Sequence, residues 1–540
     1  MAVAEEDISN TVKDYVFDLH QATRAKLTKE QSEVNDLYGA KFAELSKTFY
    51  SDAAWPAAES IASDVGDDKL FLCFYREMTY RQQSSKSFGN KASSSQLWQN
   101  YCALFDILLA GEDTDMMINE RWAFDIVKEF VYNFQTSCQH RMDLLRRTSE
   151  EIEVLKANPD MWNLATVSKY LRGLVKVSNV EAILAAQRAA GQPSDKLDLA
   201  NDKSLPPAPS KMHFDLGYFA LFGLSRLECL LGDYGSSLAV LAPVDVCGEN
   251  EYYHRVFGCY LELYYHLGFA FLMVRRYKDC ITVLGTMVST ISRLDKSGQL
   301  NRVSGGEGKR AKTMADRMAT LLAIAAALSP GHGAKLGDVV QGMSRESAQK
   351  FLDSKSTLEA AVDGSEFESY FEKACPKFIS AALPNYDQPT SLVHAPVRRQ
   401  VDLFSKQCSQ QIQLAKIRSF LKLYTAVEIE KLAKFHGSDS VDEFRSELLA
   451  TKHLMMQTES QLGFSCAEGE VKSALDVHFY VNGAMIHVDD DTTEKEVRHE
   501  NFFMAEIRKT EAAVKQMRKS MAEQLKVQAP APTPKRSYDD

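Results

Sequence analysis

One glycine-rich segment, "SGGEGKR" at residues 304–310, approaches the spacing of a phosphate-binding loop. Such a loop needs a glycine at position 303 and a hydroxyl residue at position 310, because the backbone amides surround the phosphates and the hydroxyl holds magnesium. Val303 and Arg310 occupy those positions. We therefore interpret the segment as a flexible loop and not as a nucleotide site.

Other arrangements that could support chemistry also fail on spacing. "GHGAKLG" at 331–337 follows a helical pattern and Pro330, without the strand that a dinucleotide site requires. The sequence holds no H-E-x-x-H and no His-x-His, and its twelve histidines are scattered. Carboxylate pairs such as Glu112 with Asp115 lie in polar loops, where charge usually serves solvation. We predict no catalytic residue, no cofactor and no metal, with an unrecognised enzyme as the remote alternative.

The composition is that of a soluble globular protein, with 45% hydrophobic and 25% charged residues. At 540 residues the chain exceeds one ordinary core, so roughly two to four structural units are expected. A net charge of −10 argues against a protein whose main task is to neutralise phosphates. Ten cysteines without a C-x-x-C pair predict reduced thiols in the cytosol or nucleus. We expect no signal peptide and no membrane span, because residues 260–274, the longest apolar stretch, are too few.

Residues 1–190 predict an N-terminal helical domain. In the segment 122–135, Trp122, Ile126, Phe130 and Phe134 recur every four residues, as expected of a helix that buries one face. The polar segment 84–96 is a predicted loop. Residues 191–211 are richer in proline, and we predict that they form a linker to a second domain.

Residues 218–241 and 264–284 nearly repeat each other. Aligning Tyr234 with Tyr277 gives an offset of 43 residues (277 − 234). The same offset pairs further apolar positions: Leu224 with Leu267, Leu231 with Val274, Leu238 with Ile281, and Leu241 with Leu284. Each copy is a helix, a break and a second helix, close in length to TPR, HEAT and armadillo units. We predict a helical-repeat solenoid over 212–400 that offers a groove to partners; two unrelated helical hairpins are the alternative.

The region 401–491 predicts a winged helix. Thr425 with Glu428 and Ser440 with Glu443 have the spacing of capping boxes, and Gly437 is placed to end the first of two helices. "VHFYV" and "AMIHV" then flank Asn482-Gly483, a strong hairpin signal, and form the only convincing β structure.

A long helix follows at 492–526, and the tail 527–540 is expected to be disordered. The apolar stripe of this helix is narrow, as in a helix that joins a bundle. We predict that the wing and this helix form a protein interface through Phe479, Tyr480, Met485, Ile486, Phe503, Ile507, Val514, Met517 and Met521.

Charge decides between the two uses of a winged helix. A DNA reader places its second helix in the major groove with basic side chains toward the DNA. Here that helix carries Asp442, Glu443 and Glu447 against Arg445 and Lys452. The wing is followed by three aspartates at 489–491. Both features favour protein–protein use, and the hairpin edge is suited to β-augmentation.

Helical repeats followed by a winged helix and a terminal helix resemble the PCI module of the proteasome lid, the signalosome and a translation initiation factor. Within that group the chain is similar to the L-subunit family of eukaryotic translation initiation factor three, over about residues 35–518. Three stretches carry the resemblance: residues 55–81, 375–387 ("CPKFISAALPNYD") and 417–435 ("IRSFLKLYTAVEIEKLAKF"). In the first, the matching residues are Trp55, Pro56, Glu59, Gly66, Tyr75, Glu77, Tyr80 and Arg81.

The resemblance implies a non-catalytic scaffold in a cytoplasmic hetero-oligomer, the initiation factor, which binds the small ribosomal subunit and helps recruit messenger RNA. It implies other PCI subunits as partners, with subunits K and E as neighbours. RNA contact would be secondary. The alternatives are a scaffold of the proteasome lid or signalosome, and a winged-helix nucleic-acid binder with a basic patch such as Arg146, Arg147, Arg275 and Arg276.

Overall fold

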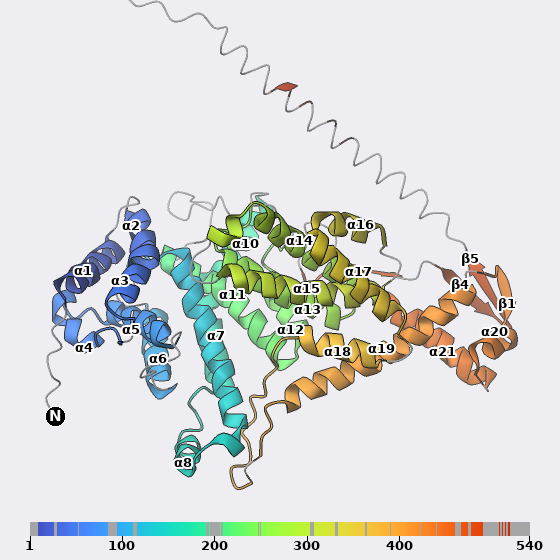
Figure 1. The fold of residues 1–540 in the computed structure, drawn as a ribbon, viewed down its shortest axis with the longest axis horizontal. Coiled ribbons are helices and arrows are strands. Elements are labelled where there is room, and N and C mark those ends of the chain that lie inside the picture. Colours follow the sequence, from blue (N-terminus) through green and yellow to red (C-terminus); the bar gives the residue numbers. More distant parts are fainter. Residues whose placement is uncertain are drawn as a thin grey trace, which may run out of the picture. The chain divides into compact units, whose positions relative to one another are not determined.

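The computed structural model describes the chain at residues 9–25, 30–51, 53–84, 94–111, 116–190, 194, 206, 209–246, 248, 250–302, 307–329, 333–361, 364–388, 390–421, 423–438, 440–459, 466–473, 477–489, 507, 510, 514, 517 and 518. The described part is mainly helical with small antiparallel sheets, which confirms the predicted fold class (Figure 1). Two compact units are present: residues 1–413 with 456–474, and residues 414–455 with 475–540. A search of the described helices finds none long and apolar enough to cross a bilayer.

In the described residues the first unit begins with ten helices, and all of them except the eighth contribute to a common core rich in aromatic side chains. They are α1 (Asn10–Arg24), α2 (Glu30–Asp36), α3 (Phe42–Thr48), α4 (Ala58–Ile61), α5 (Lys69–Ser84), α6 (Ser94–Ala110), α7 (Glu120–Met142), α8 (Ser149–Ala157), α9 (Leu164–Ser178) and α10 (Val180–Ala189). The predicted stripe of α7 is confirmed, because Trp122, Ile126, Phe130 and Phe134 are all fully buried. Trp122 stacks on Tyr38 with ring centroids 4.8 Å apart. Complete burial of one such side chain contributes roughly 1.5–3 kcal/mol.

The two predicted repeats are the helix pairs α11 (Lys211–Leu231) with α12 (Tyr234–Val240), and α13 (Phe257–Met273) with α14 (Tyr277–Lys296). Each pair turns through a left-handed residue, Gly232 at φ 90° and Arg275 at φ 63°. In each turn two amides bond back to the helix in the pattern of a Schellman end. These bonds run from Gly232 to Cys229, Asp233 to Glu228, Arg275 to Leu272 and Arg276 to Phe271. Donors and acceptors both recur at the 43-residue offset, so backbone geometry confirms the repeat.

Helices continue to stack after the second repeat. α15 (Glu307–Leu328) packs against α14, α17 (Arg345–Glu359) and α18 (Ser365–Ala374), while α16 (Gly333–Gly342) packs on α14. This succession is that of a solenoid in which each layer covers the previous one. Residues 307–310 of "SGGEGKR" form the first turn of α15 rather than a loop, and 303–306 lie outside the described residues.

The sequence suggested a domain division at 191–211, but α11 packs against α7 and α9 of the preceding segment. The helices on both sides therefore belong to one compact unit. The division between units falls instead at residue 413, inside the long helix α19 (Ala395–Leu421). The reason is the apolar character of α11, which has Phe214, Leu216, Tyr218 and Phe219 buried on several sides and needs neighbours all around.

A second hairpin was missed by the sequence analysis, which assigned all β structure to the wing. β2 (Met456–Glu459) pairs antiparallel with β3 (Glu470–Ser473), and both belong to the first unit. The hairpin is tied to the start of α14, because the Arg276 guanidinium donates to the carbonyls of Cys466 and Glu468, and Lys278 pairs with Glu459. Strands as polar as "MQTE" and "EVKS" carry little periodic signal, so tertiary contacts define them.

The second unit is a winged helix. Helices α20 (Ile429–His436) and α21 (Val441–Leu454) accompany a three-stranded sheet with the order β1-β5-β4, formed by β1 (Ala426–Glu428), β4 (His478–Asn482) and β5 (Met485–Asp489). Its core includes Val427, Ile429, Leu432, Phe444, Leu448, Phe479 and Ile486. The predicted winged helix is confirmed.

Two details of the winged helix differ from prediction. The capping box at Thr425 is wrong, because residues 426–428 pair with β5 and the first helical amide, of Ile429, donates to the carbonyl of Ala484. The hairpin loop lies one residue later than predicted, at Gly483-Ala484, since Asn482 still pairs with Met485. Gly483 has φ 60°, as a type II′ turn requires at its first loop position.

The other helix-end signals hold. Gly437 closes α20 with φ 87°, and the Ser440 hydroxyl accepts the amide of Glu443 at 3.4 Å. A side-chain acceptor of this kind stabilises a helix start by about 1 kcal/mol.

Candidate protein interface

The wing places its apolar residues alternately inward and outward. Phe479 is 3% exposed and Ile486 is fully buried, so both fill the core of the second unit. Tyr480 is 55% exposed and Met485 is half-buried. Of the four wing residues expected at the interface, Tyr480 and Met485 are therefore those that reach the surface.

Tyr480 is held in place from the neighbouring strand. Its ring stacks on His487, its partner in the β4–β5 register, at 5.1 Å between centroids and 19° between planes. The order β1-β5-β4 leaves β4 at an edge of the sheet. An edge strand next to a fixed, exposed aromatic side chain offers main-chain groups to pair with and a side chain to anchor, and one of those groups, the carbonyl of Phe479, already accepts from Lys452.

The expected residues of the C-terminal helix are described in part. Residues 507, 510, 514, 517 and 518 are helical, whereas Phe503 and Met521 lie outside the described residues. Ile507 is 52% exposed, Val514 44% and Met517 61%. Exposed apolar side chains at positions 507, 514 and 517 repeat with helical spacing, as expected of a face that packs against another protein.

The two cations of α21 bind the wing of the same chain. Lys452 Nζ donates to the carbonyl of Phe479 at 2.9 Å and lies 5.5 Å from the centroid of its ring. Arg445 donates to the carbonyl of Gly483 in the hairpin loop. These residues are seven apart, so they lie on one face of α21. Arg445 and Lys452, the two basic residues that the sequence sets against the carboxylates of this helix, are thus both engaged with the wing.

Asp442 and Glu443 of α21 are exposed, whereas Glu447 is half-buried beside His436 at 4.0 Å. A helix that presents carboxylates while its cations bind backbone carbonyls would repel phosphates. Of the basic patch considered in the sequence analysis, Arg276 is 5% exposed and pairs with Asp279 at 2.8 Å. Arg146 is 83% exposed and pairs with Asp143. The buried position of Arg276 removes one of the four members of that patch from the surface.

Other exposed apolar residues on the second unit were not singled out from the sequence. In the described residues they are Leu423, Phe435, Leu449 and Val441, at 74%, 46%, 44% and 40% exposed. Phe435 stacks on Phe420 at 5.8 Å. A signal was available in "IRSFLKLYTAVEIEKLAKF", where Phe435 falls outside the buried stripe of α20 formed by Ile429, Leu432 and Ala433.

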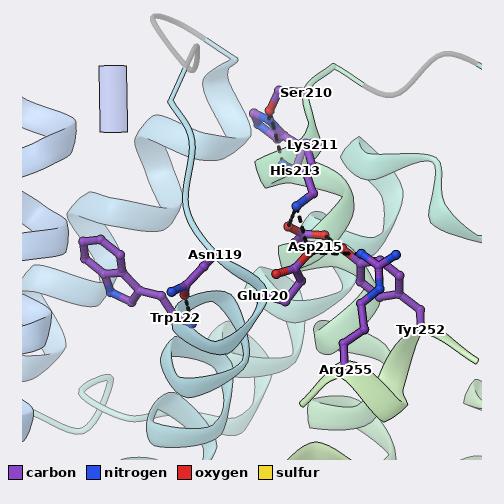
Figure 2. Close-up of polar contacts among 9 residues, drawn as sticks. All are labelled: Asn119, Glu120, Trp122, Ser210, Lys211, His213, Asp215, Tyr252 and Arg255. Carbon is purple, nitrogen blue, oxygen red and sulfur yellow. Dashed lines mark hydrogen bonds and ion pairs between the residues drawn. The ribbon is translucent and has the colours of Figure 1, made fainter. Parts of the chain in front are cut away.

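A group of polar side chains lies in the first unit, where α7, α11 and residues 252–255 meet (Figure 2). Tyr252 donates to Asp215 at 2.5 Å, and Lys211 and Arg255 both contact Glu120, at 2.9 and 3.2 Å. Asp215 is fully buried, and burial raises its pKa to about 7 against the opposing effect of Lys211. A carboxylate enclosed in this way has no access to a substrate. The group therefore serves to join the three segments.

No catalytic or metal site was predicted from the sequence. In the described ranges, no three His, Cys, Asp or Glu side chains come together as metal ligands. The described cysteines are free thiols, and all of them except Cys102 are buried.

The residues that carry the family resemblance make contacts that hold the fold together. In the stretch 55–81, the Tyr75 hydroxyl donates to the carbonyl of Pro56 at 3.0 Å, and the Trp55 indole donates to Ser46. Glu77 pairs with Arg81 at 3.2 Å inside the core. Each of these contacts fixes one helix or turn against another.

The stretch 375–387 crosses three helices. The carbonyl of Ala374 just before it accepts from Tyr265 of α13, and the carbonyl of Lys377 accepts from Gln135 of α7. The amide of Ile379 donates to the carbonyl of Leu230 in α11. The stretch acts as a strap over the first unit, which explains why a segment without regular structure has a distinctive sequence.

Comparison with known proteins agrees with these observations. A family model described as RNA polymerase I-associated factor PAF67 matches residues 93–510. Relatives named eukaryotic translation initiation factor 3 subunit L include those of Xenopus laevis and Homo sapiens, 35% and 34% identical over 519 residues, which is 95% of this chain and 88% of each relative. The protein of that name from Danio rerio is 35% identical over 95% of this chain and 86% of its own length.

The similarity extends through both compact units, and it includes the aromatic core, the strap and the winged helix. Identity of this extent and level is that of a shared family. The chain belongs to the family of eukaryotic translation initiation factor 3 subunit L.

Proposed function

We propose that this chain is a non-catalytic scaffold subunit of the eukaryotic translation initiation factor 3 complex. The observation that carries the proposal is the similarity, over 95% of the chain, to proteins named as a subunit of that factor. A translation factor acts where ribosomes initiate, so we expect the protein in the cytoplasm. Its role there is to join other PCI subunits and to support recruitment of messenger RNA to the small ribosomal subunit.

The winged-helix unit supplies the contact with other PCI subunits in this proposal. Tyr480 lies on the edge strand β4 and Met485 on the central strand β5, and the C-terminal helix offers Ile507, Val514 and Met517. Phe503 and Met521 extend the same predicted stripe. The family resemblance implies that subunits K and E are the neighbours that cover these residues.

Direct RNA binding by the winged helix is the second use of this fold. The engagement of Arg445 and Lys452 with the wing favours protein contact instead, because it leaves Asp442 and Glu443 as the outward charges of α21. A proteasome-lid or signalosome scaffold shares the architecture. The names of the relatives favour the initiation factor over both.

The test is sedimentation of the tagged chain from a lysate through a sucrose gradient, with mass spectrometry of the proteins that co-purify. We expect a peak with the small ribosomal subunit and other initiation-factor subunits, K and E among the strongest. A peak with lid or signalosome subunits and none with ribosomes would place the same module in a different assembly and contradict the proposal.

A further inference from the structure

A cavity of about 220 Å³ lies in the first unit at the starts of three helices. α7 begins at Glu120, α13 at Phe257 and α15 at Glu307. Residues from the first turns of all three, among them Arg121, Gly258 and Arg310, line the cavity. The scaffold function assigned above uses none of them.

The lining is cationic although the whole chain carries a net charge of −10. Arg121, Lys128, Arg255 and Arg310 line the cavity, against the two carboxylates Asp125 and Glu307. Asp125 is itself neutralised from behind, because Arg81 pairs with it at 3.1 Å and the Tyr38 hydroxyl donates to it at 2.8 Å.

The arginines are held in ion pairs that leave their own side chains accessible. Arg121 pairs with Glu307 at 3.1 Å, Arg255 with Glu120 at 3.2 Å, and Arg310 with Glu262. Their side chains are 45%, 37% and 48% exposed. Only the Arg121–Glu307 pair is exposed on both sides and therefore worth about 0–1 kcal/mol, because the carboxylates of Glu120 and Glu262 are 15% and 9% exposed. A ligand with more than one negative charge can therefore share these guanidinium groups.

Lys128 interacts with a carboxylate at longer range, since its charge helps to lower the pKa of Glu262. Within the described residues its ammonium has no carboxylate at ion-pair distance and lies 5.8 Å from the Phe124 ring centroid. It is half-buried, and an ammonium in that position gains from an anionic partner.

The start of α13 adds backbone amide donors to the lining of the cavity. Its N-cap residue, Val256, has no side-chain acceptor, and the first turn contains no acidic residue. By contrast, α7 has Asn119 and Glu120 at its start, and α15 has Glu307. The first amides of α13, at Phe257 and Gly258, therefore lack the side-chain partner that an anion would replace.

The lowered pKa values of two buried carboxylates beside the cavity are consistent with a positive potential there. Burial by itself would raise the pKa of Glu262, but Arg226, Lys128 and Arg310 outweigh that effect and hold it below its usual value. The pKa of Glu120 is lowered in the same way, since Lys211 and Arg255 outweigh burial.

We propose that this cavity binds a phosphate group. Guanidinium forks and an uncapped helix start suit the tetrahedral oxygens of phosphate better than a single carboxylate. The recessed shape admits a terminal phosphate, carried either by a small phosphorylated molecule or by the 5′ end of an RNA chain. The inference goes beyond the scaffold role, and neither depends on the other.

The primary test measures binding of inorganic phosphate to the full chain by isothermal titration calorimetry, at an ionic strength held constant with chloride. We expect saturable binding that acetate at equal concentration does not displace. Lys128→Gln is expected to weaken it about tenfold, the equivalent of about 1.4 kcal/mol. Lys169→Gln, which removes an exposed lysine from α9, is expected to leave it unchanged.

Arg121→Gln provides a second variant at the rim if Lys128→Gln fails to fold, and it is expected to weaken binding likewise. Absence of saturable binding, displacement by acetate, or equal affinity in the folded lining variants and the Lys169 control would each overturn the proposal. Competition experiments then identify the kind of molecule that carries the bound phosphate. Displacement by adenosine 5′-monophosphate alone assigns a small molecule, and displacement by a 5′-phosphorylated but not a 5′-hydroxyl pentaribonucleotide assigns an RNA end.

Discussion

The Tyr277 hydroxyl donates a hydrogen bond to Oε1 of Gln411 at 2.9 Å, in the core of the helical repeats. One repeat earlier, Tyr234 donates to Gln400 at the same distance. Both glutamines belong to α19, where they are eleven residues apart and therefore on one face of the helix. The long helix thus contacts equivalent positions of successive repeats and fixes their spacing.

The Tyr277 bond is expected to contribute more than its counterpart. Tyr277 is 3% exposed, and its removal leaves a buried acceptor on Gln411. Tyr277→Phe should therefore lower the free energy of unfolding by roughly 1–3 kcal/mol, and Tyr234→Phe by about 1 kcal/mol. The measurement is urea denaturation followed by circular dichroism. Equally small losses of unfolding free energy for Tyr277→Phe and Tyr234→Phe would contradict the prediction that the Tyr277 bond contributes more.

Asp215 should make the stability of the first unit depend on pH. Burial raises its pKa from 3.8 in the unfolded chain to about 7 in the folded chain. The stabilisation that protonated Asp215 gives the folded state is therefore fully present below pH 4. It is lost as the pH rises toward 7, because the unfolded chain releases this proton more readily than the folded chain does. Asp215→Asn removes this loss, so its melting temperature relative to the wild type should rise between pH 5 and pH 8.

Scanning calorimetry across that pH range measures the effect, which at about 1.4 kcal/mol per pKa unit amounts to a few kcal/mol. Glu77, whose pKa burial also raises to about 7, titrates in both proteins and cancels in the comparison. Asp160→Asn, at an exposed turn, is the matched control and should show no trend. A constant difference between Asp215→Asn and the wild type would show that Asp215 is already ionised at pH 5.

The cations of α21 should stabilise the wing rather than bind RNA. Arg445→Ala with Lys452→Ala removes charged donors from the carbonyls of Gly483 and Phe479. Amide hydrogen exchange in β4 and β5 should accelerate by a factor corresponding to about 1–3 kcal/mol. Lys434→Ala, an exposed lysine of α20, is the control. Unchanged exchange together with a loss of RNA affinity would instead assign these residues to nucleic acid.

The apolar face of the C-terminal helix should be needed for assembly but not for folding. Ile507 and Val514 are 52% and 44% exposed, so a charge at either position costs little in the isolated chain. Ile507→Asp with Val514→Asp should release the protein from its complex while helicity stays unchanged. Co-purification and circular dichroism measure the two properties.

The control for that pair places aspartates at exposed apolar positions elsewhere, Val154 on α8 and Leu352 on α17. Retention of the control and loss of the test variant assign the interface to the C-terminal helix. Full association of Ile507→Asp with Val514→Asp, at wild-type helicity, would disprove the assignment.

The elements that the sequence predicts well are those whose pattern is local. The stripe from Trp122 to Phe134 and the offset from Tyr234 to Tyr277 depend on helical periodicity within one segment, and both are confirmed. Asn482 and Gly483 located the hairpin to within one residue for the same reason. In these segments the turn residues and the spacing of buried residues are compatible with few other local structures.

What the sequence did not predict depends on partners far along the chain. Residues 426–428 form a strand because β5 lies beside them, although Thr425 and Glu428 have the spacing of a capping box. Whether Lys452 meets phosphate or the carbonyl of Phe479 is likewise decided by the approach of the wing. Inward and outward positions alternate along a strand, so Phe479 and Tyr480 could not both be exposed, but which one is buried depends on the core of the unit.

The chain passes between its two compact units at residues 413, 455 and 474. Truncation is therefore a poor way to isolate the winged helix. A fragment that starts at residue 414 carries a hairpin whose partners Arg276 and Lys278 have been cut away, and one that ends at 413 leaves those cations without the carbonyls and carboxylate they bind. Excision of the winged helix as a folded piece requires that residues 456–474 be replaced by a short turn. A gene fragment that starts or ends at this boundary without that replacement would leave both the fragment and the remaining chain without contacts that they need.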